Sequence, residues 1–180
     1  MSANAPSAAT SAASSDLDEA LGSVRVGPED FDVSSEIAAL RAGDVGVGAV
    51  VAFVGTVREW READQTAASV MELEHYPGMT ERSIARLIVE ARTRFDVRGV
   101  RVIHRVGPLA VTDQIVLVAV TSAHRGQAFQ CAEFLMDWLK TQAPFWKKES
   151  AGGQGHWVDA RIADDEAAAR WGGSGPRNAS

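Results

Sequence analysis

The fold is decided by residues 114–141, which read QIVLVAVTSAHRGQAFQCAEFLMDWLKT. The first seven residues form an apolar run with the length and composition of a strand that is buried on both faces. The apolar side chains that follow at helical spacing are Ala128, Ala132, Leu135 and Leu139. Pro144 comes soon afterwards and ends the helical pattern. We therefore predict a buried strand at 114–120 and a helix at about 125–142.

On both sides of this stretch the chain alternates between strand and helix patterns. We predict further strands at 48–57 (nearly continuously apolar, as if covered on both faces), 69–75 (alternating), 99–106 and about 156–161. We predict further helices after Ser34 or Ser35, after Thr80, and near 164–171. Strands mixed with three or four helices indicate an α+β architecture.

The bulk composition is that of one ordinary domain with tails. The chain has 180 residues, 46% of them hydrophobic, and a formal net charge of −6, which disfavours general nucleic-acid binding. A single cysteine, Cys131, excludes an internal disulfide framework and favours a reducing compartment. No apolar run approaches the roughly 20 residues that a membrane span needs.

The two ends of the chain differ in composition from the middle. Residues 1–22 are rich in Ala and Ser and contain no Lys or Arg, so they lack the basic start of a secretory signal and the arginines of a transit peptide. Residues 172–180 read GGSGPRNAS, a flexible composition. We expect a disordered tail at 1–22, a folded domain at 23–171, a flexible tail at 172–180, and a cytoplasmic location.

The lysines of this chain are clustered. All three, Lys140, Lys147 and Lys148, lie within nine residues, and the other fifteen basic side chains are arginines. A partly buried lysine can lose its proton and act as an acid, a base or a nucleophile, whereas arginine stays charged. The simpler interpretation is helix C-terminal charge followed by a solvated basic loop. The clustering alone leaves both interpretations open.

Three further groups could bind an anion or perform chemistry. His124 and Arg125 follow a buried strand and open a helix, where backbone N–H groups favour anions. Met136 and Lys140 are four residues apart on one helical stripe, so the methionine could desolvate the amine. Arg58 follows the apolar strand at 48–57. The alternatives are a helix cap at His124, a surface lysine paired with a neighbouring carboxylate, and a strand that ends in a solvated charge.

Metal and thiol chemistry have little support in the pattern. The four histidines and one cysteine show no metal-ligand spacing, so we expect no metal and no cofactor. Cys131 lies among apolar residues in the predicted helix and is expected to be a packed thiol rather than a nucleophile.

Several long strings together resemble the large, catalytic subunit of molybdopterin synthase, the MoaE family. The strings are GAVVAFVGTVR (48–58), LEHYPGMTE (73–81), VIHRVG (102–107), VTSAHR (120–125) and FLMDWLKTQAPFWKKE (134–149). They occur in the family's order and span about residues 23–171. The Ala/Ser-rich N-terminus lies outside the family pattern.

The resemblance implies a fold and an activity. The fold would be an α/β hammerhead with an additional small antiparallel β subdomain. The chain would form a homodimer within a heterotetramer, and each end would bind a small ubiquitin-like sulfur-carrier subunit through its C-terminal Gly-Gly thiocarboxylate. Two sulfurs would pass in turn to cyclic pyranopterin monophosphate, giving molybdopterin. Neither nucleic acid nor a membrane would take part.

The resemblance also implies the site residues. Lys140 and Lys147 would be catalytic, with Lys140 beside the terminal carbonyl of the carrier. The residues expected to bind substrate are Thr56, Val57, Arg58, His124, Arg125, Lys140, Lys147, Lys148 and Glu149. Phe53 and Met136 would line the pocket. Because sulfur would come from the partner, a catalytic cysteine is not required.

Two other functions are compatible with the residues. A non-catalytic phosphate- or anion-binding module would bind ligand without sulfur transfer. An interaction scaffold would use Pro144, Phe145 and Trp146 as a patch and would not depend on Lys140.

Overall fold

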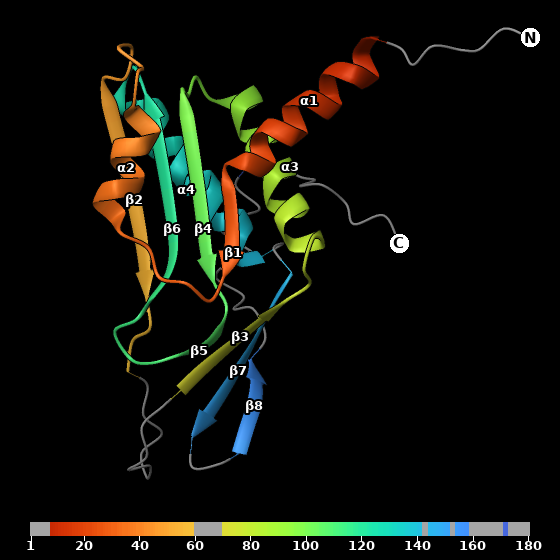
Figure 1. Ribbon diagram of the computed structural model, residues 1–180, viewed down its shortest axis with the longest axis vertical. Helices are drawn as coiled ribbons and strands as arrows, with labels where there is room; N and C mark the ends of the chain where they lie inside the picture. The colour runs from red at the N-terminus through yellow and green to blue at the C-terminus, as the bar shows by residue number, and fades with distance from the viewer. Residues whose placement is uncertain (1–7, 60–69, 142–143, 152–153, 159–170, 173–180) are drawn as a thin grey trace, which may run out of the picture.

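The computed structural model describes residues 8–59, 70–141, 144–151, 154–158 and 171–172. Four helices and eight strands in these ranges form two four-stranded sheets (Figure 1). In chain order they are α1 (Ala8–Gly22), β1 (Val24–Gly27), α2 (Val33–Arg41), β2 (Ala49–Thr56), β3 (Val70–His75), α3 (Met79–Arg94), β4 (Gly99–Arg105), β5 (Gly107–Leu109), β6 (Gln114–Ser122), α4 (Arg125–Thr141), β7 (Phe145–Ala151) and β8 (Gln154–Val158).

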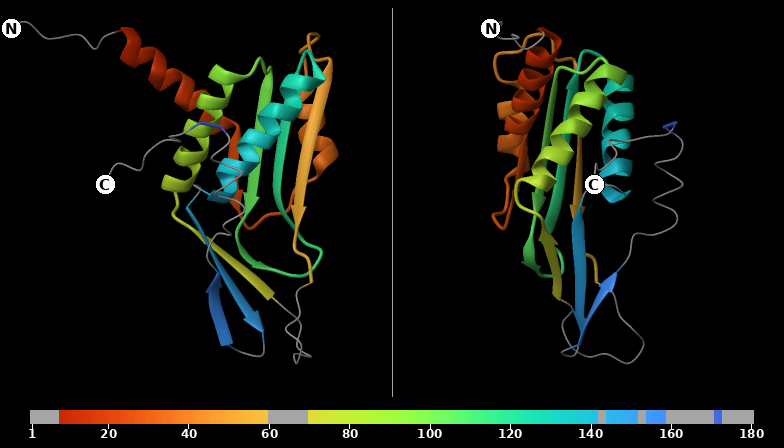
Figure 2. Two further views of the ribbon diagram at one scale, coloured as in Figure 1. Left: turned by 180° about the vertical axis from the view of Figure 1, so that it is seen from behind. Right: turned by 90° about the vertical axis from the view of Figure 1, so that its right-hand side faces the viewer.

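The main sheet has the strand order β1-β4-β6-β2. β1 is parallel to β4, and the other neighbours are antiparallel. Helices α3 and α4 cover one face of this sheet and α2 lies on the other (Figures 1 and 2). β6 is central and carries no charged side chain, and its residues from Val116 to Ser122 are all buried. This strand and the helix after it confirm the prediction from residues 114–141.

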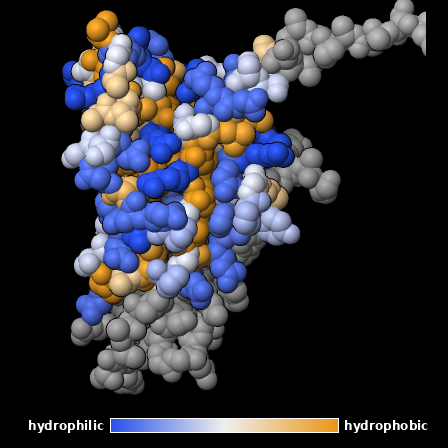
Figure 3. All heavy atoms as spheres, viewed as in Figure 1, coloured by the Kyte–Doolittle hydropathy of each residue, from blue (hydrophilic) through white to orange (hydrophobic). Residues whose placement is uncertain are grey.

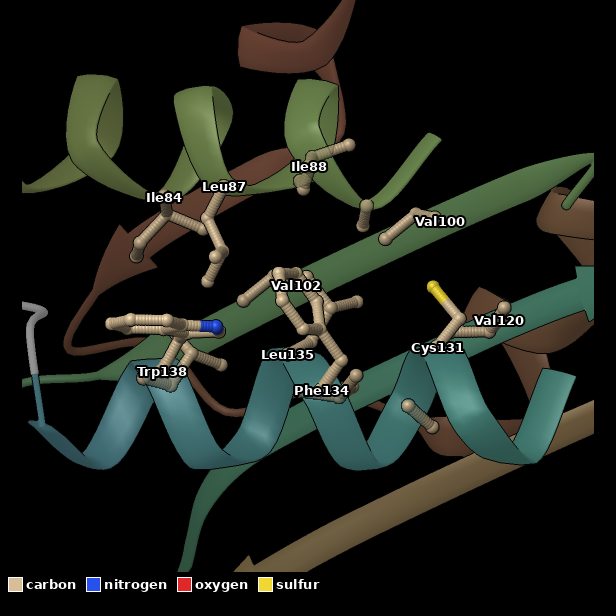
Figure 4. Close-up of a cluster of buried hydrophobic side chains, with 14 of the residues drawn as sticks. Ile84, Leu87, Ile88, Val100, Val102, Val120, Cys131, Phe134, Leu135 and Trp138 are labelled. Atoms are coloured by element: carbon tan, nitrogen blue, oxygen red, sulfur yellow. The ribbon is translucent and has the colours of Figure 1, made fainter. Parts of the chain in front are cut away.

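The larger core lies between the main sheet and helices α3 and α4. Ile84, Leu87 and Ile88 of α3 face Phe134, Leu135 and Trp138 of α4 across Val100, Val102 and Val120 (Figure 4). The helical spacing of the apolar residues in both helices produces these two facing stripes. Burial of such a side chain stabilises the fold by about 1.5–3 kcal/mol. This packing holds α3 and α4 against the main sheet.

The face of the main sheet that carries α2 has a smaller core. Phe31, Ile103, Leu117 and Ala119 are buried there. Charged side chains surround them: Glu36 of α2 accepts a 2.9 Å hydrogen bond from Arg101 and lies 3.6 Å from Arg25. Polar residues accordingly dominate this face, with apolar atoms visible between them (Figure 3).

The smaller sheet has the order β5-β3-β7-β8, all antiparallel, and extends beyond one end of the main sheet (Figures 1 and 2). A cluster of Val57, Met71, Leu73 and Leu109 is buried beneath it. This sheet confirms the small antiparallel β subdomain, and the whole arrangement confirms the α+β class.

One expectation about the elements is wrong. Residues 8–22 are not disordered but form α1, because Ala20 is fully buried against α3 and Glu19 accepts a 2.9 Å hydrogen bond from Arg92. Lys147 and Lys148 lie in β7, a strand that the sequence pattern did not predict, so the alternative of a basic loop after the helix does not hold. The expected helix near 164–171 lies outside the described residues except for Trp171, and the expected tail at 172–180 lies outside them except for Gly172.

The apolar strand at 48–57 also differs from its prediction. Among the described strands β2 lies at the edge of the main sheet, and Ala52 and Phe53 are exposed. An apolar strand sequence indicates that the strand is covered, but it does not specify whether the covering surface belongs to the same chain or to a partner.

Candidate functional site

The connection between β6 and α4 forms a hollow at one end of the main sheet. Its volume is about 450 Å³, and its lining residues are Gly48, Ala49, Ala123, His124, Arg125 and Gly126. His124 and Arg125 are exposed, and the first turn of α4 contains no acidic residue. A helix N-terminus offers backbone N–H groups and a positive dipole end. The hollow is therefore suited to an anion.

Two backbone features fix the shape of this hollow. Ser122 is buried, its hydroxyl donates a 2.8 Å hydrogen bond to the carbonyl of Asp96, and it accepts a 3.2 Å bond from the His124 N–H. A Cβ on Gly48 would lie only 2.3 Å from the Ala123 carbonyl oxygen. Only glycine therefore allows the start of β2 to lie this close to the end of β6.

A second group of predicted site residues lies where β2 ends. The Val57 N–H donates a 2.8 Å bond to the Asp113 carbonyl, and the Val57 carbonyl accepts a 2.8 Å bond from Thr112. Val57 is buried, whereas Thr56 and Arg58 are exposed on either side of it. The buried residue therefore holds the backbone from which the exposed side chain of Arg58 projects.

Phe53 and Met136 lie on β2 and α4, two elements that pack against each other. Phe53 is 41% exposed, and its Cε1 atom lies 3.4 Å from the position that a Cβ on Gly55 would take. The ring thus lies along its own strand over a glycine. Met136 is partly buried against the larger core. An exposed aromatic ring and a half-buried methionine on neighbouring elements are side chains suited to contact with a partner or ligand.

The lysine cluster spans two elements. Lys140 is in the last turn of α4 and is exposed, so the desolvation by Met136 that the sequence suggested is absent in the free chain. In β7, Lys147, Lys148 and Glu149 pair in register with Leu73, Glu72 and Met71 of β3. The side chains of these three β7 residues lie outside the described part of the structure.

The predicted site residues fall into two groups at opposite ends of the main sheet. His124 and Arg125 lie with the start of β2, whereas Arg58 and Lys140 lie at the ends of β2 and α4 (Figure 2). From Arg125 to Lys140 the helix rises by about 22 Å at 1.5 Å per residue. A substrate of the size of a pterin phosphate cannot span this distance. Within one chain the predicted site residues therefore do not all meet at a single site.

A comparison of the sequence with known families identifies the fold family. The family described as "MoaE protein" matches residues 26–142. The chain belongs to the MoaE family. The matched segment contains Arg58, His124, Arg125 and Lys140 and ends before β7.

Named relatives and solved structures agree with this family. The molybdopterin synthase catalytic subunit of Ralstonia nicotianae is 56% identical over 149 residues, covering 83% of this chain and 84% of the relative. The structure of molybdopterin cofactor biosynthesis protein E from Burkholderia multivorans has a TM-score of 0.72 at 51% identity, covering 85% and 98% of the two chains. The crystal structure of molybdopterin synthase from Staphylococcus aureus has a TM-score of 0.68 at 29% identity, covering 75% and 96%.

Sequence reasoning missed the small residues that shape the MoaE hollow. Gly48, Ala49 and Gly126 line it but carry no functional group, so no motif singled them out. A signal was present for Gly48, because an isolated glycine at the start of an apolar strand suggests close approach of another backbone.

Other kinds of site find no support in the described ranges. Within them, no group of three or more His, Cys, Asp or Glu side chains could hold a metal ion. None of the helices seen there is long and apolar enough to cross a membrane. Cys131 is fully buried, and burial raises the pKa of its thiol to about 12, so it stays protonated at neutral pH. The proposed scaffold patch is also not free, because Phe145 stacks on His104.

Proposed function

We propose that this chain is the catalytic subunit of a molybdopterin synthase and acts as a sulfurtransferase. It would move two sulfurs, one after the other, from the thiocarboxylated Gly-Gly terminus of a small ubiquitin-like carrier to cyclic pyranopterin monophosphate. The observation that carries the proposal is the identity of 56% to a named molybdopterin synthase catalytic subunit over most of both chains. A cytoplasmic location remains part of the proposal.

The roles of the residues follow from their chemistry. In each round the carrier's sulfur bonds to a substrate carbon, and a carbon–oxygen bond at that carbon breaks, its oxygen leaving as water or remaining on the phosphate. Water then cleaves the bond between that sulfur and the carrier's carbonyl carbon. The carrier leaves as a carboxylate, and the sulfur stays on the substrate. Lys140 would stabilise the oxyanion that forms at this carbonyl and assist proton transfer. The exposed position of Lys140 allows the carrier tail to reach and partly bury it.

The remaining basic residues would hold the substrate. Arg58, His124 and Arg125 would bind the phosphate and the pterin through charge-assisted hydrogen bonds. Thr56, Val57, Lys147, Lys148 and Glu149 complete the proposed binding set. Phe53 and Met136 would line the wall of the pocket. No metal and no cofactor is assigned a role.

We infer that a homodimer joins the two groups of site residues. β2 pairs with β6 on one side only among the described strands, and its sequence AVVAFVGT has no charge. Such an edge normally requires cover. If the β2 strands of two copies pair antiparallel about a twofold axis, the start of one strand lies beside the end of the other. His124 and Arg125 of one copy then approach Arg58 and Lys140 of its partner.

The assignment of function is tested with purified components. The chain is mixed with cyclic pyranopterin monophosphate and carrier, and the dithiolene product is measured. Product should form with the thiocarboxylated carrier and not with the same carrier ending in a plain carboxylate. Ligand binding without product, under conditions where a known synthase turns over, would instead support the anion-binding module that the hollow near His124 favours.

Mixing inactive variants tests the two-chain site. Lys140→Ala and His124→Ala are each expected to be nearly inactive. After dissociation and reassociation, half of the dimers contain one of each, and one of their two sites is intact, so about a quarter of the normal activity returns. Mixing Lys140→Ala with Arg58→Ala is the matched control and should restore nothing, because both residues would come from the same chain. No recovery in the first mixture would contradict the two-chain site.

A further inference from the structure

A ring stack involves Phe145, which lies between the two predicted catalytic lysines and close to the second of them. Phe145 is the first residue of β7, and its ring stacks on the imidazole of His104 with centroids 3.8 Å apart and planes at 19°. His104 lies on β4 of the main sheet, paired in register with Val116 and Val26. This contact therefore ties the smaller sheet to the larger one.

His104 is held in one protonation state. Its Nδ1 lies 2.9 Å from the carbonyl oxygen of Arg105. A carbonyl oxygen only accepts, so Nδ1 carries the hydrogen and donates it. Burial lowers the pKa of His104 to about 4, so the ring is neutral at pH 7. A neutral imidazole can stack on Phe145 without removing a charge from water.

A second contact fixes the chain just before the stack. The hydroxyl of Thr80 is fully buried, donates a 3.2 Å hydrogen bond to the Pro144 carbonyl and accepts a 3.1 Å bond from the Tyr76 N–H. His75 of β3 pairs in register with Phe145, and its Nε2 lies 3.6 Å from a carboxylate oxygen of Glu81. Elements β3, α3, β4 and β7 thus meet at one junction.

We propose that His104 and Phe145 are positioning residues that set β7 and its lysines relative to the end of α4. The proposal rests on the proposed function of Lys140 and Lys147. Phe145 lies five residues after the first lysine and two before the second, so a shift of its ring moves the start of β7 with respect to Lys140. A displacement of about 1 Å at a catalytic group can lower a rate by about 10²-fold. Neither His104 nor Phe145 touches the substrate.

The test uses Phe145→Leu and His104→Leu, which remove the stack, and Phe145→Tyr, which keeps an aromatic ring. Both leucine variants should lower kcat by about 10²-fold. The KM for the carrier should change less than threefold, roughly, because Lys140 and the β2 end stay in place. Phe145→Tyr should recover most of kcat.

A matched control separates positioning from stability. Phe95 contacts Phe134 edge to face at 5.6 Å, away from the junction. Phe95→Leu should lower the melting temperature about as much as Phe145→Leu but leave kcat unchanged. Equal loss of kcat in the control, normal kcat in Phe145→Leu, or no rescue by Phe145→Tyr would each overturn the proposal.

Hydrogen exchange makes the result independent of the proposed function. In Phe145→Leu the amides of β7 should exchange about tenfold faster, whereas those of β6 should not change. Unchanged β7 exchange would overturn the positioning role even if the unmodified chain proves inactive as a synthase. If the amides of β7 exchange faster in Phe145→Leu but the unmodified chain has no synthase activity, the positioning role of the stack stands and the proposed function is rejected.

Discussion

The two sheets of this molecule differ in what their residues do. The main sheet lies between helices, and its central strand β6 is buried and uncharged from Val116 to Ser122. The smaller sheet contains alternating and ionisable sequence: Glu72 and Glu74 in β3, and Lys147, Lys148 and Glu149 in β7. Its described side chains bury only one small cluster.

The difference indicates a division of labour. The main sheet supplies stability and places the ends of β2 and α4, whereas the smaller sheet supplies ionisable groups at the edge of the core. Variants in the first region should therefore change unfolding, and variants at the junction and in the second region should change turnover. The predictions below are arranged to separate these two effects, beginning with the largest.

Lys140→Arg should break function without breaking the fold. Arginine keeps the charge, but its guanidinium is larger and planar and cannot give up a proton. If Lys140 performs acid–base work, turnover should fall by about 10²–10⁴-fold. Lys148→Arg is the control and should be milder if that residue supplies only charge. Turnover, carrier affinity and melting temperature are measured for both. Near-normal turnover of Lys140→Arg would show that charge alone suffices.

Leucine truncation compares the two cores directly. Leu117 in β6 is fully buried, and Leu117→Ala should lower the free energy of unfolding by about 2–5 kcal/mol. Leu73 in β3 is 7% exposed and pairs in register with Lys147. Leu73→Ala should cost less stability, about 2 kcal/mol, but lower kcat about tenfold.

Denaturant unfolding and turnover well below the melting temperature check this pair. The division of labour fails if Leu117→Ala lowers kcat as strongly as Leu73→Ala does in the folded protein.

The predicted helices and strands were most accurate where the hydrophobic periodicity was strong. They were least accurate where tertiary packing determined the local structure. β6 and α4 follow the predicted spans closely, because a continuous apolar run and a helical stripe are unambiguous. β7 was missed because Phe-Trp-Lys-Lys-Glu-Ser does not alternate. α1 was missed because its Ala- and Ser-rich sequence has little periodicity, and its burial against α3 comes from a tertiary contact.

The site shows the same limit. The residue types of Lys140, His124 and Arg58 identified candidates, and the family resemblance supported them. The separation of Arg125 from Lys140 follows from the length of the predicted helix, but which end of β2 lies beside each of them depends on the packing of β2 against α4. The exposure of Lys140 and the open edge of β2 likewise depend on which surfaces the fold leaves uncovered.

His104, whose ring stacks on Phe145 and joins the two sheets, should make the free energy of unfolding depend on pH. His104 has a pKa of about 4 in the folded state, against an ordinary value of 6.5. Between these values the unfolded chain binds the extra proton, so stability is present above pH 6.5 and is lost as the pH falls toward 4. The slope should approach about 1.4 kcal/mol per pH unit in the middle of this window.

Urea unfolding between pH 7 and pH 4.5 measures this slope, and His104→Phe should remove most of it. The backbone N–H of Phe31 lowers the pKa of Asp30, and the hydroxyl and then the N–H of Ser35 lower the pKa of Asp32. The guanidinium of Arg98 and then the N–H of Gly46 lower the pKa of Asp44. Loss of stability from these carboxylates begins only near and below pH 4, as the pH falls toward their lowered pKa values. An equal slope in His104→Phe would show that other groups dominate the window.

Cys131→Ala should give the smallest change in activity. The thiol is buried in the larger core beside α3, with its pKa raised to about 12, so almost no thiolate exists at pH 7–8. Removing the sulfur from this core should cost about 1–2 kcal/mol of stability. Turnover with thiocarboxylated carrier should stay within about twofold of normal, because the transferred sulfur comes from the carrier. An aromatic disulfide reagent should label Cys131 slowly in the folded chain and rapidly in urea. Complete loss of turnover in a variant that remains folded would mean that this thiol takes part in the reaction, and the proposed transfer of sulfur directly from the carrier to the substrate would then be wrong.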